Sequence, residues 1–258
     1  MAQTVTAGGR RTAYDVSGDG TPLVLIHGAE SDRRQFADFI PVLRKGIRAI
    51  SYDQRDTGAA APAGYGMADL ADDLADLLDT LDLPAAHLLG TSFGGAVAQH
   101  FALRSPDRVL SLTLVATMAA YPVLAGFAAR AKGMTADEHA ATMLAASVSD
   151  AARAADPGLP ERVAKALVPR EPEQRARRRT ALLGHDVETR LPEIKAPTLV
   201  IHGTDDPIVP FDSAVRLASL IPQAQLVPLD GGRHGLGFEF RDRLAATVSD
   251  FVLDHPAG

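Results

Sequence analysis

Short apolar runs recur along the chain, separated by polar turns and by longer helical patterns. Leu23–Ile26 is a continuous apolar run that follows the turn residues Ser17–Gly20. Such runs are typical of strands that are buried on both faces of a parallel sheet. On these grounds we predict strands at Arg11–Val16, Leu23–Ile26, Ala49–Tyr52, His87–Leu89, Leu110–Val115, Thr198–Ile201 and Gln225–Leu229.

Helical patterns lie between these strands. In Met67–Leu81, the residues Leu70, Leu74, Leu77 and Leu81 fall on one stripe of a helix. Further helices are predicted at Arg33–Leu43, Ser92–Leu103 and Asp242–Leu253. Strands that alternate with helices of this length need crossover connections, so the sequence predicts an α/β fold with a mostly parallel central sheet and helices on both faces.

The alternation stops in residues 119–193. This segment has helical composition, breakers at Pro157, Gly158 and Pro160, and no convincing strand. We therefore predict a core made of residues 1–118 and 194–258, into which a helical cap of residues 119–193 is inserted.

Composition narrows the class of protein. The chain has 258 residues, of which 46% are hydrophobic and 22% are charged, as in ordinary folded proteins. Its formal net charge of −6 makes a nucleic-acid partner unexpected, because phosphate backbones are repelled. The absence of cysteine excludes a disulfide framework, a thiolate metal site and a cysteine nucleophile.

The apolar runs also bear on location. Met1–Thr4 shows no basic segment leading into an apolar one, so no secretion signal is recognised. No apolar run reaches the roughly 18 residues of a membrane-spanning helix. We expect a cytoplasmic protein without a membrane partner, and no oligomeric state is predicted.

The clearest chemical motif is Gly90–Gly94, which reads Gly-Thr-Ser-Phe-Gly between a predicted strand and a predicted helix. A sharp strand-to-helix turn strains the backbone of its central residue, and the flanking glycines relieve crowding. The hydroxyl of Ser92 would then project above the sheet, at the positive end of a helix dipole. We interpret Ser92 as a nucleophile; the alternative is that it only caps the helix.

An oxyanion formed by such a nucleophile needs two converging N–H donors. One would be the N–H of Phe93, directly after the serine. The other would come from the loop after the first buried strand, where Gly28 lets the backbone approach the site. We predict Ala29 as this donor, with Gly28 and Glu30 as alternatives, and expect His27 to pack and hydrogen-bond locally.

Two adjacent aspartates follow the strand Thr198–Ile201. An acid at a strand end can accept the Nδ1–H of an imidazole and so fix its tautomer. Asp206 precedes Pro207, which restricts it to extended backbone, and we favour it over Asp205. The strand Leu110–Val115 is followed by no acid, so it offers no competing position.

His234 lies in a glycine-rich loop after the last predicted strand. No HxxxH pair and no cysteine surrounds it, which argues against a metal ligand. We interpret His234 as a general base and expect no metal and no cofactor. The order Ser92, Asp206, His234 is a known triad order, and each residue follows the carboxyl end of a strand, where open parallel sheets place their sites.

Together these motifs resemble those of the α/β-hydrolase superfamily over almost the whole chain. The matching stretches are His27-Gly28, Tyr52–Gly58, Gly90–Gly94, Gly203–Asp206 and Gly232–His234. The resemblance implies a triad of Ser92, Asp206 and His234, with Ala29 and Phe93 as oxyanion donors. The chain also resembles small carboxylesterases, polyketide methyl esterases and enol-lactonases.

Two further stretches of the sequence are rich in charged residues. Many relatives carry glycine where this chain has Asp56, and we interpret the neighbouring Asp53 and Arg55 as a structural network beneath the site. We interpret the cluster Arg170–Arg179 as a solvated helix face, the alternative being an anchor for an anionic substrate.

The sequence therefore predicts a serine hydrolase that cleaves a small-molecule carboxylic ester or lactone through an acyl-enzyme on Ser92. Alternatives with the same triad are C–C bond hydrolysis, acyl transfer and cofactor-free decarboxylation or oxygenation, and a ligand-binding receptor is the alternative without catalysis. Aromatic residues are few and none is tryptophan, which indicates an aliphatic pocket. Met118, Tyr121 and Ile208 are its predicted lining.

Overall fold

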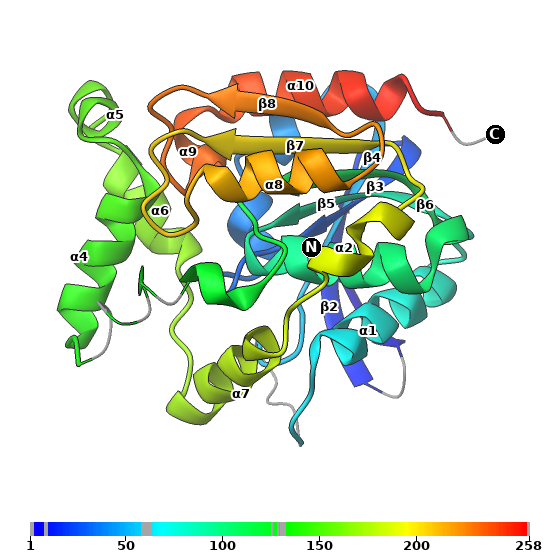
Figure 1. Cartoon of the computed structure of the whole chain (residues 1–258), viewed down its shortest axis with the longest axis horizontal. Helices are drawn as coiled ribbons and strands as arrows, with labels where there is room; N and C mark the ends of the chain where they lie inside the picture. Colours follow the sequence, from blue (N-terminus) through cyan, green and yellow to red (C-terminus); the bar gives the residue numbers. More distant parts are fainter. Residues whose placement is uncertain are drawn as a thin grey trace.

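An eight-stranded sheet forms the centre of the protein (Figure 1). The computed structural model describes residues 3–7, 10–57, 63–124, 126, 127, 129 and 133–256. The strand order is β1-β2-β4-β3-β5-β6-β7-β8. The strands are β1 (Gln3–Ala7), β2 (Arg10–Ser17), β3 (Gly20–Ile26), β4 (Gly46–Tyr52), β5 (Ala86–Thr91), β6 (Val109–Val115), β7 (Thr198–Gly203) and β8 (Gln225–Leu229).

The pairing of these strands confirms the predicted, mostly parallel sheet. β1 pairs with β2 and β2 with β4 in antiparallel fashion, and all the other neighbours are parallel. The strand β1 was not predicted, because Gln3–Ala7 contains no apolar run. It lies at the edge of the sheet, where a largely exposed strand needs none.

Helices pack on both faces, as predicted. The α-helices include α1 (Met67–Thr80), α2 (Phe93–Arg104), α4 (Ala136–Ser147), α5 (Asp150–Ala155), α6 (Leu159–Ala166), α7 (Pro172–Leu183), α8 (Asp212–Leu220), α9 (Leu236–Glu239) and α10 (Arg241–Leu253). The 3-10 helices are η1 (Arg33–Phe36), η2 (Ile40–Val42), η3 (Pro106–Arg108), η4 (Tyr121–Leu124) and η5 (Glu188–Glu193).

Alternate residues of the buried strands serve two separate cores. Val24 and Ile26 of β3 join the cluster that contains α1, α2 and α8. Leu23 and Leu25 of the same strand join the cluster that contains η1 and α10. This alternation is the pleat of a strand buried on both faces, and it explains why Leu23–Ile26 is continuously apolar.

The predicted helix at Arg33–Leu43 is wrong. Two 3-10 helices replace it, η1 and η2. The carboxylate of Asp32 accepts the N–H of Arg34 and starts the first, and Pro41 in the second has no N–H to donate to a longer helix. The helix α8 was not predicted.

Between β6 and β7 the described residues are mostly helical, with one isolated bridge between Ala120 and Asp186. Figure 1 shows α4, α5 and α6 beyond the arrowheads of β7 and β8, at the carboxyl end of the sheet. The division into a core and a cap remains a prediction.

None of the helices in the described ranges has the length and apolar character that a membrane crossing requires.

Candidate active site

Ser92 lies at the turn from β5 into α2. Its φ of 53° and ψ of −115° are a backbone conformation that residues other than glycine rarely adopt. A Cβ atom on Gly90 would collide with the carbonyl of Gly94, and one on Gly94 would collide with the carbonyl of Ile26. The tight turn thus requires both glycines. The Ser92 side chain makes no capping hydrogen bond, so the alternative of a simple helix cap finds no support.

Three hydrogen bonds hold the carbonyl of Ser92. It accepts from the N–H of Gly95 at 2.9 Å, from the N–H of Ala96 at 3.2 Å and from Oγ1 of Thr117 at 2.7 Å. This carbonyl and the N–H of Phe93 belong to one planar peptide unit and point in opposite directions. The three bonds therefore fix the direction of the Phe93 N–H.

His27 has a local role, as predicted. Its ring is fully buried; Nδ1 lies 2.8 Å from the carbonyl of Gly28, and Nε2 lies 3.3 Å from the N–H of Gln54. Burial, followed by the charge of Arg178, holds the pKa of His27 well below its ordinary value. A neutral ring that donates from Nδ1 and accepts at Nε2 satisfies both contacts.

Gly28 lies beside the Ser92 side chain. A Cβ atom added to Gly28 would be 3.9 Å from Cβ of Ser92. The N–H of Gly28 donates to Oε1 of Gln35 at 2.9 Å, so this N–H is already engaged. Of the three oxyanion donors considered in this loop, Ala29 and Glu30 remain.

Asp206 and His234 are in direct contact. The distance from Nδ1 of His234 to Oδ2 of Asp206 is 2.7 Å. The other carboxylate oxygen accepts the N–H groups of Ile208 and Val209, at 2.8 and 2.9 Å. Asp205 is exposed and its carboxylate accepts from Oγ1 of Thr204. The structure thus brings Asp206, rather than Asp205, to the histidine.

A second histidine, His202, lies against Asp206. It is fully buried on β7, and its Nε2 is 2.9 Å from the carbonyl of Val209 and 3.4 Å from Oδ2 of Asp206. Burial disfavours the ionised carboxylate, but the charge of His234 and the hydrogen bonds from both histidines outweigh it and hold the pKa of Asp206 below its ordinary value. Sequence reasoning missed His202, because nothing in the sequence distinguishes it from a core histidine.

The loop that carries His234 is fastened to the last turn of α4. The N–H of His234 donates to the carbonyl of Ala146 at 3.0 Å, and the N–H of Gly235 donates to that of Ser147 at 2.8 Å. Ser92, Asp206 and His234 follow β5, β7 and β8 at one edge of the sheet. Within the part of the chain that the structure describes, no hydrogen bond joins Oγ of Ser92 to His234.

The three predicted pocket residues meet in one apolar cluster. Met118 and Ile208 are buried there with Met143 of α4, and Tyr121 packs against them. The cluster joins the ends of β6 and β7 to the segment between these strands. The role of these side chains in a pocket stays a prediction.

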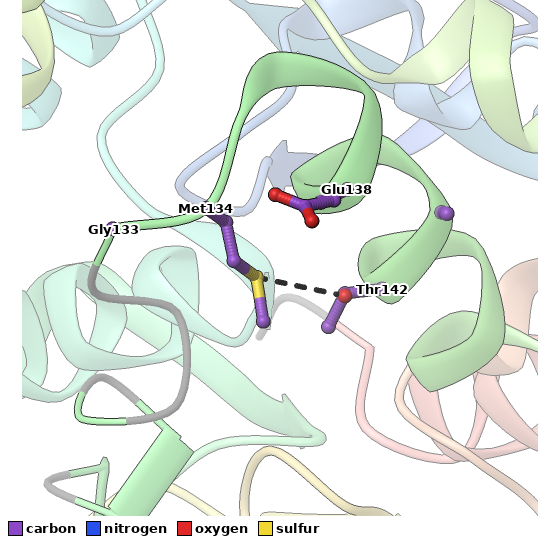
Figure 2. A pocket seen from close by; sticks show the side chains of 5 residues that line it. Gly133, Met134, Glu138 and Thr142 are labelled. Carbon is purple, nitrogen blue, oxygen red and sulfur yellow. Dashed lines mark hydrogen bonds between the residues drawn. The ribbon is translucent and has the colours of Figure 1, made fainter.

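A hollow of about 470 Å³ lies elsewhere, at the start of α4 (Figure 2). Figure 2 shows the side chains of Met134 and Thr142, which line the hollow, pointing toward one another, and Oγ1 of Thr142 lies 3.6 Å from Sδ of Met134. None of the predicted catalytic residues lines it.

In the described ranges no three His, Cys, Asp or Glu side chains are grouped so that they could hold a metal ion.

The interpretation of Arg170–Arg179 as a solvated face is wrong for two of its members. The relative exposures of Arg170 and Arg178 are 8% and 3%. Both side chains donate to backbone carbonyls of the loops that follow β3 and β4. One side of α7 packs on these loops, which spacing along the sequence does not show.

The network expected around Asp53 and Arg55 is present. Asp53 accepts from Arg33, and Arg55 donates to Asp73 at 2.7 Å. Asp56 has a φ of 57° and a fully buried carboxylate. That carboxylate pairs with Arg177 of α7 at 2.8 Å.

Comparison with known proteins gives a consistent family. The family described as alpha/beta hydrolase fold matches residues 21–240. RutD of Stutzerimonas stutzeri, to which carbamate hydrolysis is ascribed, is 34% identical over 255 residues, covering 93% of this chain and 92% of RutD. The 2-hydroxymuconate semialdehyde hydrolase of a Pseudomonas species is 30% identical over 283 residues, covering 100% and 95%. The enol-lactonase of Burkholderia xenovorans superposes with a TM-score of 0.87 at 26% identity, covering 97% and 100%.

Proposed function

The chain belongs to the α/β-hydrolase family, and from this premise we propose that it is a serine hydrolase whose triad is Ser92, Asp206 and His234. Its proposed substrates are small carboxylic esters or lactones. The observation that carries the proposal is the strained backbone of Ser92, because such a turn is retained where a side chain must project from the end of a strand. The similarity to an enol-lactonase supports the substrate class.

In the proposed reaction, Oγ of Ser92 attacks the carbonyl carbon and its proton passes to Nε2 of His234. The N–H groups of Ala29 and Phe93 donate to the oxyanion of the tetrahedral intermediate. His234 then protonates the leaving alcohol, and a water activated by the same histidine releases the acid from Ser92. The contact between Nδ1 of His234 and Asp206 supports this scheme, since it leaves Nε2 as the acceptor.

Hydrolysis of a C–C bond next to a carbonyl is the second candidate. The 30% identity to a 2-hydroxymuconate semialdehyde hydrolase, over 100% of this chain, favours it. The similarity to RutD adds carbamates to the substrates worth testing. A panel of esters and lactones of graded length, a carbamate and a vinylogous 1,3-diketone would rank these classes by kcat/KM.

We also propose that residues 119–193 form a cap over an aliphatic pocket lined by Met118, Tyr121 and Ile208. The apolar cluster that joins these residues to α4 supports this arrangement. A pocket of this kind suits acyl groups without charge. The panel of esters and lactones of graded length measures how long an acyl group the pocket accepts.

Substitution of the nucleophile tests the mechanism. Ser92→Ala should lower kcat for a p-nitrophenyl ester by about 10⁶-fold and abolish labelling by a fluorophosphonate. Ser219→Ala, which changes an exposed serine on α8, is the matched control. It should keep both the turnover of the ester and the labelling by the fluorophosphonate. Undiminished turnover in Ser92→Ala would show that the nucleophile is wrongly assigned.

A further inference from the structure

One guanidinium contacts both residues proposed as oxyanion donors. Arg178 of α7 donates from Nε to the carbonyl of Ala29 at 3.1 Å and from Nη2 to the carbonyl of Gly28 at 3.4 Å. Its Cζ atom also lies 4.3 Å from the ring centroid of Phe93. A residue from the segment between β6 and β7 thus touches the loop after β3 and the start of α2 together.

Two further hydrogen bonds of Arg178 go to the loop after β4. Nη1 donates to the carbonyl of Arg55 at 2.8 Å, and Nη2 donates to Oε1 of Gln54 at 3.3 Å. All of these acceptors are neutral oxygens, while the charges of Glu30 and Asp56 also favour the charged form of Arg178. Burial lowers the pKa of Arg178 to about 10, so the group still carries its charge at neutral pH.

Burial of a guanidinium is unfavourable, and hydrogen bonds to neutral oxygens offset only part of the lost hydration. Apolar side chains of similar volume often replace such a buried charge without loss of stability. Simple attachment of α7 to the loops would therefore not require a guanidinium at position 178. What an apolar side chain cannot do is bind carbonyl oxygens, and the carbonyl of Gly28 is one of them.

The carbonyl of Gly28 belongs to the same peptide unit as the N–H of Ala29. The two groups point in opposite directions, so donors on the carbonyl fix where the N–H points. His27 and Arg178 both contact this carbonyl, the former at 2.8 Å. A cation at the oxygen also polarises the amide and makes its N–H a stronger donor.

From this geometry we propose that Arg178 is a positioning residue, which aligns and polarises the Ala29 N–H so that it stabilises the oxyanion. The inference rests on the proposed function, because it presupposes an acyl transfer to Ser92. Arg178 contacts protein groups on one side of the peptide unit while the substrate is bound on the other. The catalytic residues thus depend on α7 although none of them belongs to it.

The test compares an ester with its matched thionoester, whose sulfur accepts hydrogen bonds weakly. Arg178→Met should lower kcat for the ester by about 10- to 100-fold, less than the 10²–10³ that follows loss of a donor itself. KM should stay within about twofold, and the ratio of ester to thionoester kcat should fall. Arg178→Lys keeps one point charge without the planar fork and should give an intermediate ratio. Arg179→Met, an exposed neighbour on α7, should leave the ratio unchanged.

Equal losses on the two substrates, or a change in KM alone, would overturn the role of Arg178. If Arg178→Met lacks a cooperative unfolding transition, Arg178→Lys is measured in its place, and a ratio equal to that of the wild type overturns the inference. Failure of the proposed function is a separate result, in which Ser92→Ala retains turnover. Loss of turnover in Ser92→Ala together with a normal ratio in the Arg178 variants would keep the function and refute the inference.

Discussion

The candidate site has two sides, which are held in place by different contacts. We call Asp206 and His234 the acid–base side, and the proposed donors Ala29 and Phe93 the oxyanion side. On the acid–base side, Asp206 is oriented by the N–H groups of Ile208 and Val209, two and three residues further along the chain. On the oxyanion side, the carbonyl of Gly28 is contacted by Arg178, 150 residues away. Contacts close in sequence therefore orient Asp206, whereas at Gly28 a long-range contact from α7 adds to the local contact of His27.

The two sides also differ in how their buried charged groups are partnered. The buried anion Asp206 is in contact with two histidines, whereas the buried cation Arg178 donates its hydrogen bonds to backbone carbonyls and to the amide oxygen of Gln54. Both sides are fastened to the segment between β6 and β7, the first through carbonyls at the end of α4 and the second through a side chain of α7. The difference indicates that a change in α7 should reach the oxyanion side without reaching the acid–base side.

Among the changes that distinguish the two sides, the largest effect should come from Asp206. Asp206→Asn keeps the shape of the side chain but removes the charge that fixes the tautomer of His234, so kcat should fall by about 10⁴-fold. Asp205→Asn is the matched control, because Asp205 is exposed and next in sequence. Steady-state kinetics on the preferred ester measure kcat for the two variants. If the two variants lose equal activity, the assignment of Asp206 is refuted.

A smaller effect is expected from Arg177, which fastens α7 without touching Gly28 or Ala29. Arg177→Met removes the cation that pairs with the buried carboxylate of Asp56, and the melting temperature should fall by on the order of 5 °C. The ester-to-thionoester ratio should not change. Adding Asp56→Asn should restore part of the melting temperature, because the buried charge is then gone.

Thermal unfolding followed by circular dichroism measures this prediction. A drop in the substrate ratio in Arg177→Met would mean that any loosening of α7 disturbs the oxyanion side. The contrast between Arg177 and Arg178 on adjacent positions of one helix would then disappear.

The smallest effect is the pH dependence of stability. The pKa of Asp206 in the folded protein is below its ordinary value, so the unfolded chain takes up the proton first as pH falls. The stabilisation is therefore complete above pH of about 5 and is lost as pH falls further, by at most about 1.4 kcal/mol per pH unit. The arginines of the oxyanion side stay charged and add nothing to this slope.

Urea unfolding of the wild type and Asp206→Asn between pH 7 and pH 3 measures the slope. The difference in unfolding free energy between the two proteins should be constant from pH 7 to about pH 5 and shrink below about pH 4. A difference that stays constant to pH 3 would contradict the lowered pKa of Asp206.

Much of the fold could be predicted because its signals are local. The apolar runs mark the central strands, and the leucine stripe of Met67–Leu81 marks α1 almost to the residue. The preference for Asp206 over Asp205 rests on the proline that follows it, and the structure has the expected contact with His234. The helix predicted at Arg33–Leu43 failed because Pro41 cannot donate the N–H that one continuous helix would need.

The sequence by itself determined the alternation of strands and helices, the turn at Ser92 and the place of Asp206 and His234 after their strands. Each depends on residues a few positions apart, whose backbone preferences act in any fold. Only the tertiary structure decided that Arg170 and Arg178 are buried, that His202 joins Asp206, and that α7 reaches the loop at Gly28. An arginine-rich helix has the same spacing on a solvated face as against a row of carbonyls, and only the packing of distant segments distinguishes the two.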